Sequence, residues 1–240
     1  HLTILLENMR REGFEMAVAK PRVVFKEING EKCEPYENLT IDLEDGHQGA
    51  IMEEIGRRRG ELVNMESDGM GRTRLEYHIP ARGLIGFQSD FMTMTRGTGL
   101  MSHVFDDYAP VKPDMPGRHN GVLISQENGE AVAYALWNLE DRGRMFVSPG
   151  DKLYEGMIIG IHSRDNDLVV NPIKGKKLTN VRASGTDEAV RLTTPIKLTL
   201  ESAVEFIDDD ELVEITPQSI RLRKRYLTEN ERKRASREGS

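Results

Sequence analysis

The pattern of apolar positions divides the first half of the chain into short helices and strands. An amphipathic helix is predicted at the start, where apolar residues recur every three or four positions: Leu2, Leu5, Leu6 and Met9. Gly13 follows them and predicts the end of that helix, and Met16 and Val18 then alternate as a strand. The Asn29-Gly30 pair is typical of a tight turn. We therefore expect residues 1–28 to be a separate helix and strand, with a new domain beginning at residue 29.

Between residues 36 and 105 the spacing of the apolar residues alternates between that of a strand and that of a helix, in an order that occurs twice. Strand-like alternation, a helical stretch and a second extended stretch follow one another, and after the Asp68–Gly71 turn the same three elements occur again. The apolar positions are Leu39, Ile41 and Leu43; Ile51, Met52 and Ile55; Leu62 and Met65; Leu75, Tyr77 and Ile79; Leu84, Phe87, Phe91 and Met94; Leu100 and Phe105. Two such β-α-β units predict an α+β, ferredoxin-like domain over residues 29–109, with an antiparallel sheet and two helices on one face.

The remaining residues, 110–240, are predicted to form a β-rich, barrel-like domain with short helices. Short apolar runs broken by Pro and Gly extend to residue 161, which is typical of such folds. The stretch 171–191 contains few large apolar side chains and predicts a long loop without a core of its own. Short apolar patterns then predict a helix near Val204 and a strand near Leu222, and Thr228 begins a final basic helix.

Composition limits the class of protein. Hydrophobic residues make up 38% of the chain and charged residues 30%, and no apolar run is long enough to span a membrane. The single cysteine, Cys33, excludes an internal disulfide framework and suits a reducing cytosol. The net charge of −7 argues against nucleic-acid binding only on average, because clustered charge is what neutralises phosphates.

No catalytic or metal-binding set can be assembled from the sequence. The phosphate loop Gly-x-x-x-x-Gly-Lys-Ser/Thr is absent, and Asp114–Gly117 is interpreted as a Pro-Gly turn rather than a GTPase switch. The six histidines do not fall at ligand spacing, so no metal site is predicted. We expect this chain to have no enzymatic activity of its own, and neither to bind nor to hydrolyse GTP.

Clustered cations are the candidates for RNA contact. The long loop supplies cations interleaved with hydrogen-bonding side chains: Lys174, Lys176, Lys177, Thr179, Asn180, Arg182, Ser184 and Arg191. A basic tail over residues 221–237 begins with Arg221, Arg223, Lys224 and Arg225. The run Arg57, Arg58 and Arg59 closes a predicted helix, where it serves RNA contact or the helix dipole equally well. We expect the loop to be mobile in the free protein and to become ordered on RNA.

Several strings resemble the BipA/TypA family of ribosome-associated translational GTPases, which are similar to elongation factor G. The stretch 1–15 resembles the last helix of the family's domain III. The stretches 49–60 and 80–87 look like the two helices of domain V, which is ferredoxin-like. The stretches 138–143, 154–160 and 176–188 resemble the family's own C-terminal domain. The resemblance covers essentially the whole chain.

This resemblance implies binding at the factor site of the 70S ribosome and to the 50S subunit, with contacts to rRNA and A-site tRNA. It implies a monomeric, cytoplasmic protein without membrane contact, and roles in ribosome assembly, stress adaptation and virulence regulation. GTP and Mg²⁺ belong to an N-terminal domain of the family that this chain lacks, so no cofactor is expected here. Two alternatives stay open. One is the C-terminal region of elongation factor 4, which the string 176–188 argues against, and the other is a ferredoxin-like metabolite-binding regulatory module unrelated to the ribosome.

Overall fold

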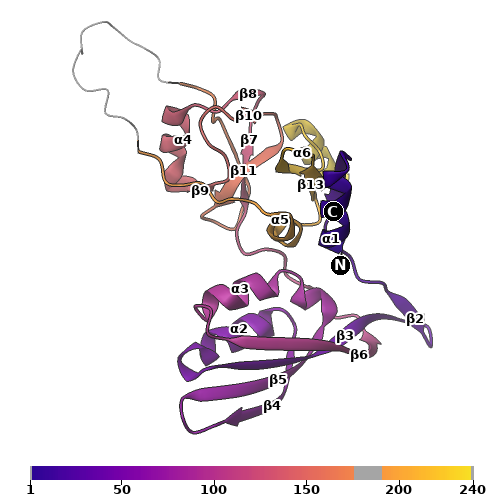
Figure 1. Cartoon of the computed structure of the whole chain (residues 1–240). Coiled ribbons are helices and arrows are strands. Elements are labelled where there is room, and N and C mark those ends of the chain that lie inside the picture. Colours follow the sequence, from indigo (N-terminus) through magenta and orange to yellow (C-terminus); the bar gives the residue numbers. More distant parts are fainter. Residues whose placement is uncertain (1, 176–190, 239–240) are drawn as a thin grey trace, which may run out of the picture. The chain divides into compact units, whose positions relative to one another are not determined.

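Residues 2–175 and 191–238 are described by a computed structural model, in which the chain divides into two units (Figure 1). One unit comprises Pro21–Gly117, and the other joins His1–Lys20 to Arg118–Ser240. Both units mix strands with short helices, so the predicted α+β class is confirmed.

The unit Pro21–Gly117 contains an antiparallel sheet with two helices on one face (Figure 1). Its elements are β2 (Lys26–Ile28), β3 (Glu31–Glu44), η1 (Asp45–His47), α2 (Gln48–Arg57), β4 (Glu61–Ser67), β5 (Arg72–Pro80), η2 (Ala81–Leu84), α3 (Phe87–Met94) and β6 (Leu100–Pro110). β3 pairs with β5 on one side and with β6 on the other, and β4 pairs with the far side of β5. This strand order is the ferredoxin-like one, as predicted.

The core of this unit follows from the alternation seen in the sequence. Odd-numbered residues of β3 and β5 point to one face of the sheet, and α2 and α3 cover that face with their own apolar residues. Among the described residues, the apolar side chains that are fully buried here are Leu39, Ile41, Leu43, Ile51, Ile55, Leu75, Ile79, Phe87 and Phe91. The even-numbered residues of these two strands are mainly polar and make the opposite face.

Both helices of this unit end in the same way, with an arginine in a left-handed conformation. Arg59 follows α2 at φ 65°, and Arg96 follows α3 at φ 50°. After each arginine a glycine N–H donates back into the last helical turn, from Gly60 to the Ile55 carbonyl at 2.9 Å and from Gly97 to the Met92 carbonyl at 2.8 Å. These contacts form a Schellman motif, whose left-handed position glycine normally occupies.

The second unit contains a seven-stranded sheet. Its elements are α1 (Leu2–Arg11), β1 (Met16–Ala19), β7 (Val122–Ser125), β8 (Gly129–Glu130), α4 (Ala133–Leu139), η3 (Glu140–Arg142), β9 (Gly143–Met145), β10 (Lys152–Leu153), β11 (Met157–His162), β12 (Leu168–Val170), α5 (Leu200–Phe206), β13 (Glu211–Ile215), β14 (Ile220–Lys224) and α6 (Glu229–Glu238). The strands lie in the order β1-β13-β14-β11-β7-β12, with β9 also paired to β11. In the described ranges this sheet does not close into a barrel, so the predicted unit is β-rich but open.

Two features of this unit differ from what the sequence pattern predicted. The first segment is not separate, because β1 pairs with β13 in a register that places Met16 opposite Ile215. α4 was not predicted, although Ala135 and Leu136 form its buried side. The final helix is confirmed, and its capping box joins the Glu231 N–H to the Thr228 hydroxyl at 3.3 Å.

The left-handed arginines lead to a stability prediction. Replacing Arg96 by Gly should raise the free energy of unfolding by roughly 0.5–1 kcal/mol, because glycine adopts a positive φ without the Cβ clash. Urea denaturation followed by circular dichroism measures this. The control Arg96→Ala keeps a Cβ and should leave stability nearly unchanged. Equal stability of the Gly and Ala variants would show that the backbone there carries no such strain.

Candidate nucleic-acid interface

Lys174 and Arg191 flank the basic stretch that the sequence marks as an RNA-contacting loop. Both side chains are exposed, and among the residues that the structure describes no acid pairs with either one. Asn171 shapes the turn before Lys174, because its Oδ1 accepts the Ile173 and Lys174 N–H groups at 3.0 and 2.9 Å. The other predicted residues of this stretch lie outside the described residues: Lys176, Lys177, Thr179, Asn180, Arg182 and Ser184.

The arginine run at the end of α2 separates into different environments. Arg58 is only 9% exposed, and its guanidinium contacts Glu54 at 2.6 Å and Asp90 at 2.7 Å. It also donates to the carbonyls of Gly83 and Ile85, so it joins α2 to η2 and α3. This is a correction to the predicted site, because a buried guanidinium whose three nitrogens all donate within the protein is not available to RNA.

The two neighbours of Arg58 are more accessible. Arg57 donates to Glu54 at 2.9 Å and to the Gly117 carbonyl at 3.2 Å, and its side chain is 26% exposed. Arg59 is exposed and donates to the carbonyl of Asp114 at 3.0 Å. Arg57 and Arg59 therefore remain candidates for phosphate contact in this unit.

The basic residues of β14 lie on both faces of the sheet, because successive side chains of a strand point to opposite faces. Leu222 and Lys224 point into the unit, while Arg221 and Arg223 point to the other face. Lys224 is 2% exposed, and its Nζ contacts Asp167 at 2.6 Å, Asp210 at 2.9 Å and Glu211 at 3.0 Å. Lys224 is thus a second correction, because a buried and triply paired ammonium cannot meet a phosphate.

Glu211 is the acid around which Arg118 and Lys224 gather, and we name the group Glu211, Arg118, Lys224 and Asp167 the Glu211 cluster. The Glu211 carboxylate is fully buried and accepts two hydrogen bonds from Arg118, at 2.8 and 2.9 Å. It also accepts the Asp208 backbone N–H at 2.9 Å. Both oxygens of this fully buried carboxylate therefore accept hydrogen bonds.

The cluster also fixes how its members ionise. Burial raises the pKa of Glu211, but the hydrogen bonds and charge of Arg118, with the charge of Lys224, outweigh burial and hold that pKa below its ordinary value. Burial lowers the pKa of Lys224, and the surrounding carboxylates reverse this and raise it above its ordinary value. Both groups are therefore charged at neutral pH.

Arg221 and Arg223 share the partly buried Glu214. Arg223 lies 3.2 Å and Arg221 3.5 Å from its carboxylate, and the Tyr154 hydroxyl donates to it at 2.7 Å. Arg223 and Tyr154 line a cavity of about 380 Å³. Arg225, by contrast, is exposed, and among the described residues its guanidinium donates to one acceptor, the Asp209 carbonyl, at 3.3 Å. Arg225 is therefore the most accessible of these predicted cations.

The sequence grouped these cations by proximity along the chain, and the structure separates the buried Arg58 and Lys224 from their more exposed neighbours. Sequence reasoning missed Arg118, which pairs with the buried Glu211. None of the described helices has the length and apolar character needed to cross a membrane.

Comparison with known proteins supplies the identification. Residues 120–229 match the family model of the TypA/BipA C-terminal domain, and residues 31–119 match that of the elongation factor G C-terminus. Over 238 residues the chain is 63% identical to the large ribosomal subunit assembly factor BipA of Escherichia coli (strain K12). The chain belongs to the TypA/BipA family. It covers 39% of the length of that relative, and the match includes 99% of this chain.

Other relatives give the same picture. Proteins of the same name from Salmonella typhimurium and Haemophilus influenzae are 63% and 60% identical, each over 99% of this chain and 39% of the relative. A solved structure from Thermus thermophilus is similar over 35% of this chain and 12% of that chain, with a TM-score of 0.33 and 23% identity.

The Glu211 cluster predicts that alanine substitution of two neighbouring cations will change the free energy of unfolding by very different amounts. Lys224→Ala should lower the free energy of unfolding by about 3 kcal/mol, because it leaves the buried Glu211 carboxylate without one of its two cations. Arg225→Ala, the matched control, should change it by less than about 0.5 kcal/mol, since this side chain is exposed. Urea denaturation of both variants measures the difference. Equal effects would mean that Lys224 is not a structural residue.

The depressed pKa of Glu211 predicts the pH dependence of stability. A carboxyl whose folded pKa lies below its unfolded value, about 4.3, stabilises the fold above that value and loses this contribution as pH falls through the folded pKa. The free energy of unfolding of Glu211→Gln should therefore be lower than that of the wild type at pH 7. This difference between the two proteins should become smaller below about pH 4. The control Glu12→Gln changes an exposed carboxylate, so its free energy of unfolding should vary with pH as that of the wild type does. A gap that stays constant from pH 7 to pH 3 would contradict this assignment.

Proposed function

We propose that this chain docks a ribosome-associated translational GTPase on the ribosome by contacting rRNA and A-site tRNA. Membership of the TypA/BipA family supports the proposal, as does the name of its relatives, large ribosomal subunit assembly factor. GTP and Mg²⁺ would be bound outside this chain, which has no phosphate loop. On this proposal the whole protein is cytoplasmic and takes part in assembly of the large subunit, stress adaptation and virulence regulation.

The exposure of Lys174 and Arg191 on either side of the basic stretch is the observation that carries the proposal. The more buried cations Arg58, Arg118 and Lys224 have carboxylate partners within 3.0 Å, whereas these two have none among the described residues. An exposed cation without an acid is available to phosphate oxygens, and binding then releases the counterions that surround the RNA. We propose that Lys176, Lys177 and Arg182 add to this contact, and that Thr179, Asn180 and Ser184 hydrogen-bond sugar or base edges.

Accessible cations elsewhere would add contacts to the same partner. Arg225 in the unit that contains residues 118–240, and Arg57 and Arg59 in the unit Pro21–Gly117, have side chains that are at least partly exposed. Arg221 and Arg223 would contribute less, because both already pair with Glu214. We propose that the two units meet ribosomal RNA independently, each through its own exposed cations.

The decisive experiment compares two charge-matched double variants of the full chain. Lys174→Ala with Arg191→Ala should weaken co-sedimentation with 50S and 70S particles carrying A-site tRNA. Each phosphate contact contributes about 0.7–0.9 to the slope of log affinity against log salt, so the slope should fall by about 1.5. The control variant, Lys152→Ala with Arg164→Ala, removes two exposed cations elsewhere in the same unit and should bind like the wild type.

Other outcomes would redirect the proposal. Equal loss in both variants would indicate non-specific attraction by net charge rather than a site at this stretch. Binding that does not depend on salt would point to an apolar protein partner. Thermal unfolding checks that the variants are folded. Exposed charges contribute little to stability, so both variants should have the melting temperature of the wild type.

A further inference from the structure

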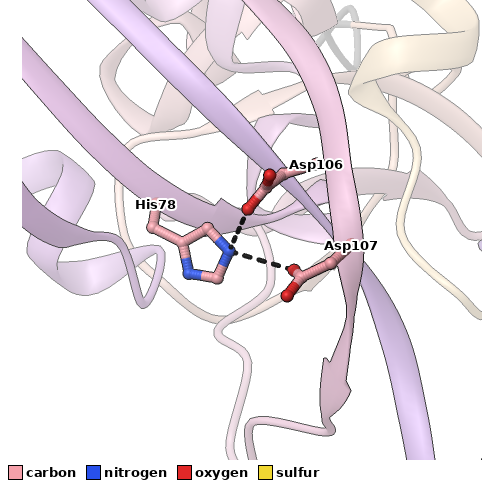
Figure 2. Close-up of side chains that lie close together, drawn as sticks. All are labelled: His78, Asp106 and Asp107. Carbon is pink, nitrogen blue, oxygen red and sulfur yellow. Dashed lines mark hydrogen bonds and ion pairs between the residues drawn. The ribbon is translucent and has the colours of Figure 1, made fainter.

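His78, Asp106 and Asp107 converge on the polar face of the ferredoxin-like sheet (Figure 2). One ring nitrogen of His78, Nε2, lies 3.2 Å from Asp106 Oδ2 and 3.2 Å from Asp107 Oδ1. Figure 2 shows both carboxylates directed at this same nitrogen. All three ligand atoms lie within 4.8 Å of one another.

A bulge in β6 is what aims two consecutive carboxylates at one point. Successive side chains on a regular strand point to opposite faces, so Asp106 and Asp107 would normally diverge. The ladder between β3 and β6 shifts register here, because Glu37 pairs with Phe105 whereas Pro35 pairs with Tyr108. The two aspartates therefore share the place opposite Tyr36. Bulges of this kind re-aim side chains and are frequent beside functional sites.

Tyr36 holds the histidine ring in place from the strand between. The rings of Tyr36 and His78 are stacked, with centroids 4.7 Å apart and planes 18° from parallel. The Tyr36 hydroxyl is itself fixed, since it donates to the carbonyl of Pro110 at 2.9 Å. The imidazole thus has a supported orientation, with Nε2 facing β6.

We propose that His78, Asp106 and Asp107 bind a divalent transition metal ion of the Zn²⁺ class. A Zn²⁺ ion with bonds of about 2.0–2.1 Å to nitrogen and oxygen holds its tetrahedral ligands about 3.3 Å apart. The two nitrogen–oxygen separations of 3.2 Å match that spacing. The ion would bind among the three atoms, with Nε2 and one oxygen from each carboxylate as ligands.

Charge and exposure are consistent with such an ion. Two carboxylates neutralise a divalent charge, and the nearby Glu61 is paired with Lys112 and is not needed as a ligand. The side chains of His78, Asp106 and Asp107 are 25%, 42% and 57% exposed, which leaves room for water to complete the coordination and for the ion to enter. The imidazole favours Zn²⁺, Co²⁺ or Ni²⁺ over Mg²⁺ and Ca²⁺, which prefer sites made of oxygen alone.

The test is a titration of the full 240-residue chain with ZnCl₂ at about pH 7.5, followed by isothermal calorimetry. We expect saturable binding that His78→Ala weakens at least about tenfold, since loss of even a supporting residue costs that much at metal sites. The variant Asp106→Asn with Asp107→Asn keeps the shape of both side chains but removes their charge, and it should lose binding to a similar degree. Replacing Zn²⁺ by Co²⁺ should give visible absorption bands in the wild type that both variants lack.

His103 provides the matched control. It lies on the same sheet, and its Nδ1 contacts a single carboxylate, that of Glu37, at 2.9 Å. The variant His103→Ala removes a partly exposed histidine without touching the proposed ligands, so its zinc affinity should equal that of the wild type. Circular dichroism confirms that each variant is folded. Equal affinity in wild type, His78→Ala and the aspartate variant, or no saturable binding by the wild type, would overturn the proposal.

Discussion

The fold of the larger unit, which joins His1–Lys20 to Arg118–Ser240, depends on one buried carboxylate, that of Glu211. Removing a carboxylate from water is costly unless cations and hydrogen bonds surround it, and here Arg118, Lys224 and the Asp208 N–H meet that requirement. Arg118 lies just before β7, Glu211 begins β13 and Lys224 ends β14. The Glu211 cluster therefore brings stretches far apart in sequence to the same end of one sheet. A strand placed in any other register would leave a charge buried without its partner.

Asp167 extends this constraint to the parallel strand. One of its oxygens contacts Lys224, and the other accepts the Val122 N–H at 2.9 Å, where β7 begins. β12 follows Asp167 directly and pairs with β7 in parallel, whereas the other ladders of this sheet in the described ranges are antiparallel. The Glu211 cluster thus helps to position both the antiparallel pair β13 and β14 and the parallel pair β7 and β12. It also includes Lys224, which charge density along the sequence assigned to a binding surface, and the exposed cations are left as the candidates for RNA contact.

The sequence predicted the ferredoxin-like domain because its signals are local. Alternation in β3 and β5 and the helical spacing of Phe87 and Phe91 each extend over a few residues, and the sheet order follows from two successive β-α-β units. The larger unit depends on pairings that no local period reveals, such as Met16 with Ile215. The same limit applies to the site. Charge density marked Arg58 and Lys224 correctly as cations, but burial depends on which face of a helix or strand each one occupies.

The histidine cluster shows how a site can be invisible to spacing rules and still be well defined in space. A search for ligands at short intervals finds nothing at His78, because its partners lie on a strand that is not adjacent to its own. The intervening strand contributes the stacked ring of Tyr36, and a single extra residue in β6 turns both aspartates the same way. Each of these features is ordinary alone, and a bulge or a stacked ring needs no ligand. Their convergence on one nitrogen, at the spacing of ligands around a metal ion, is what a sheet can build from residues that sequence separation keeps apart.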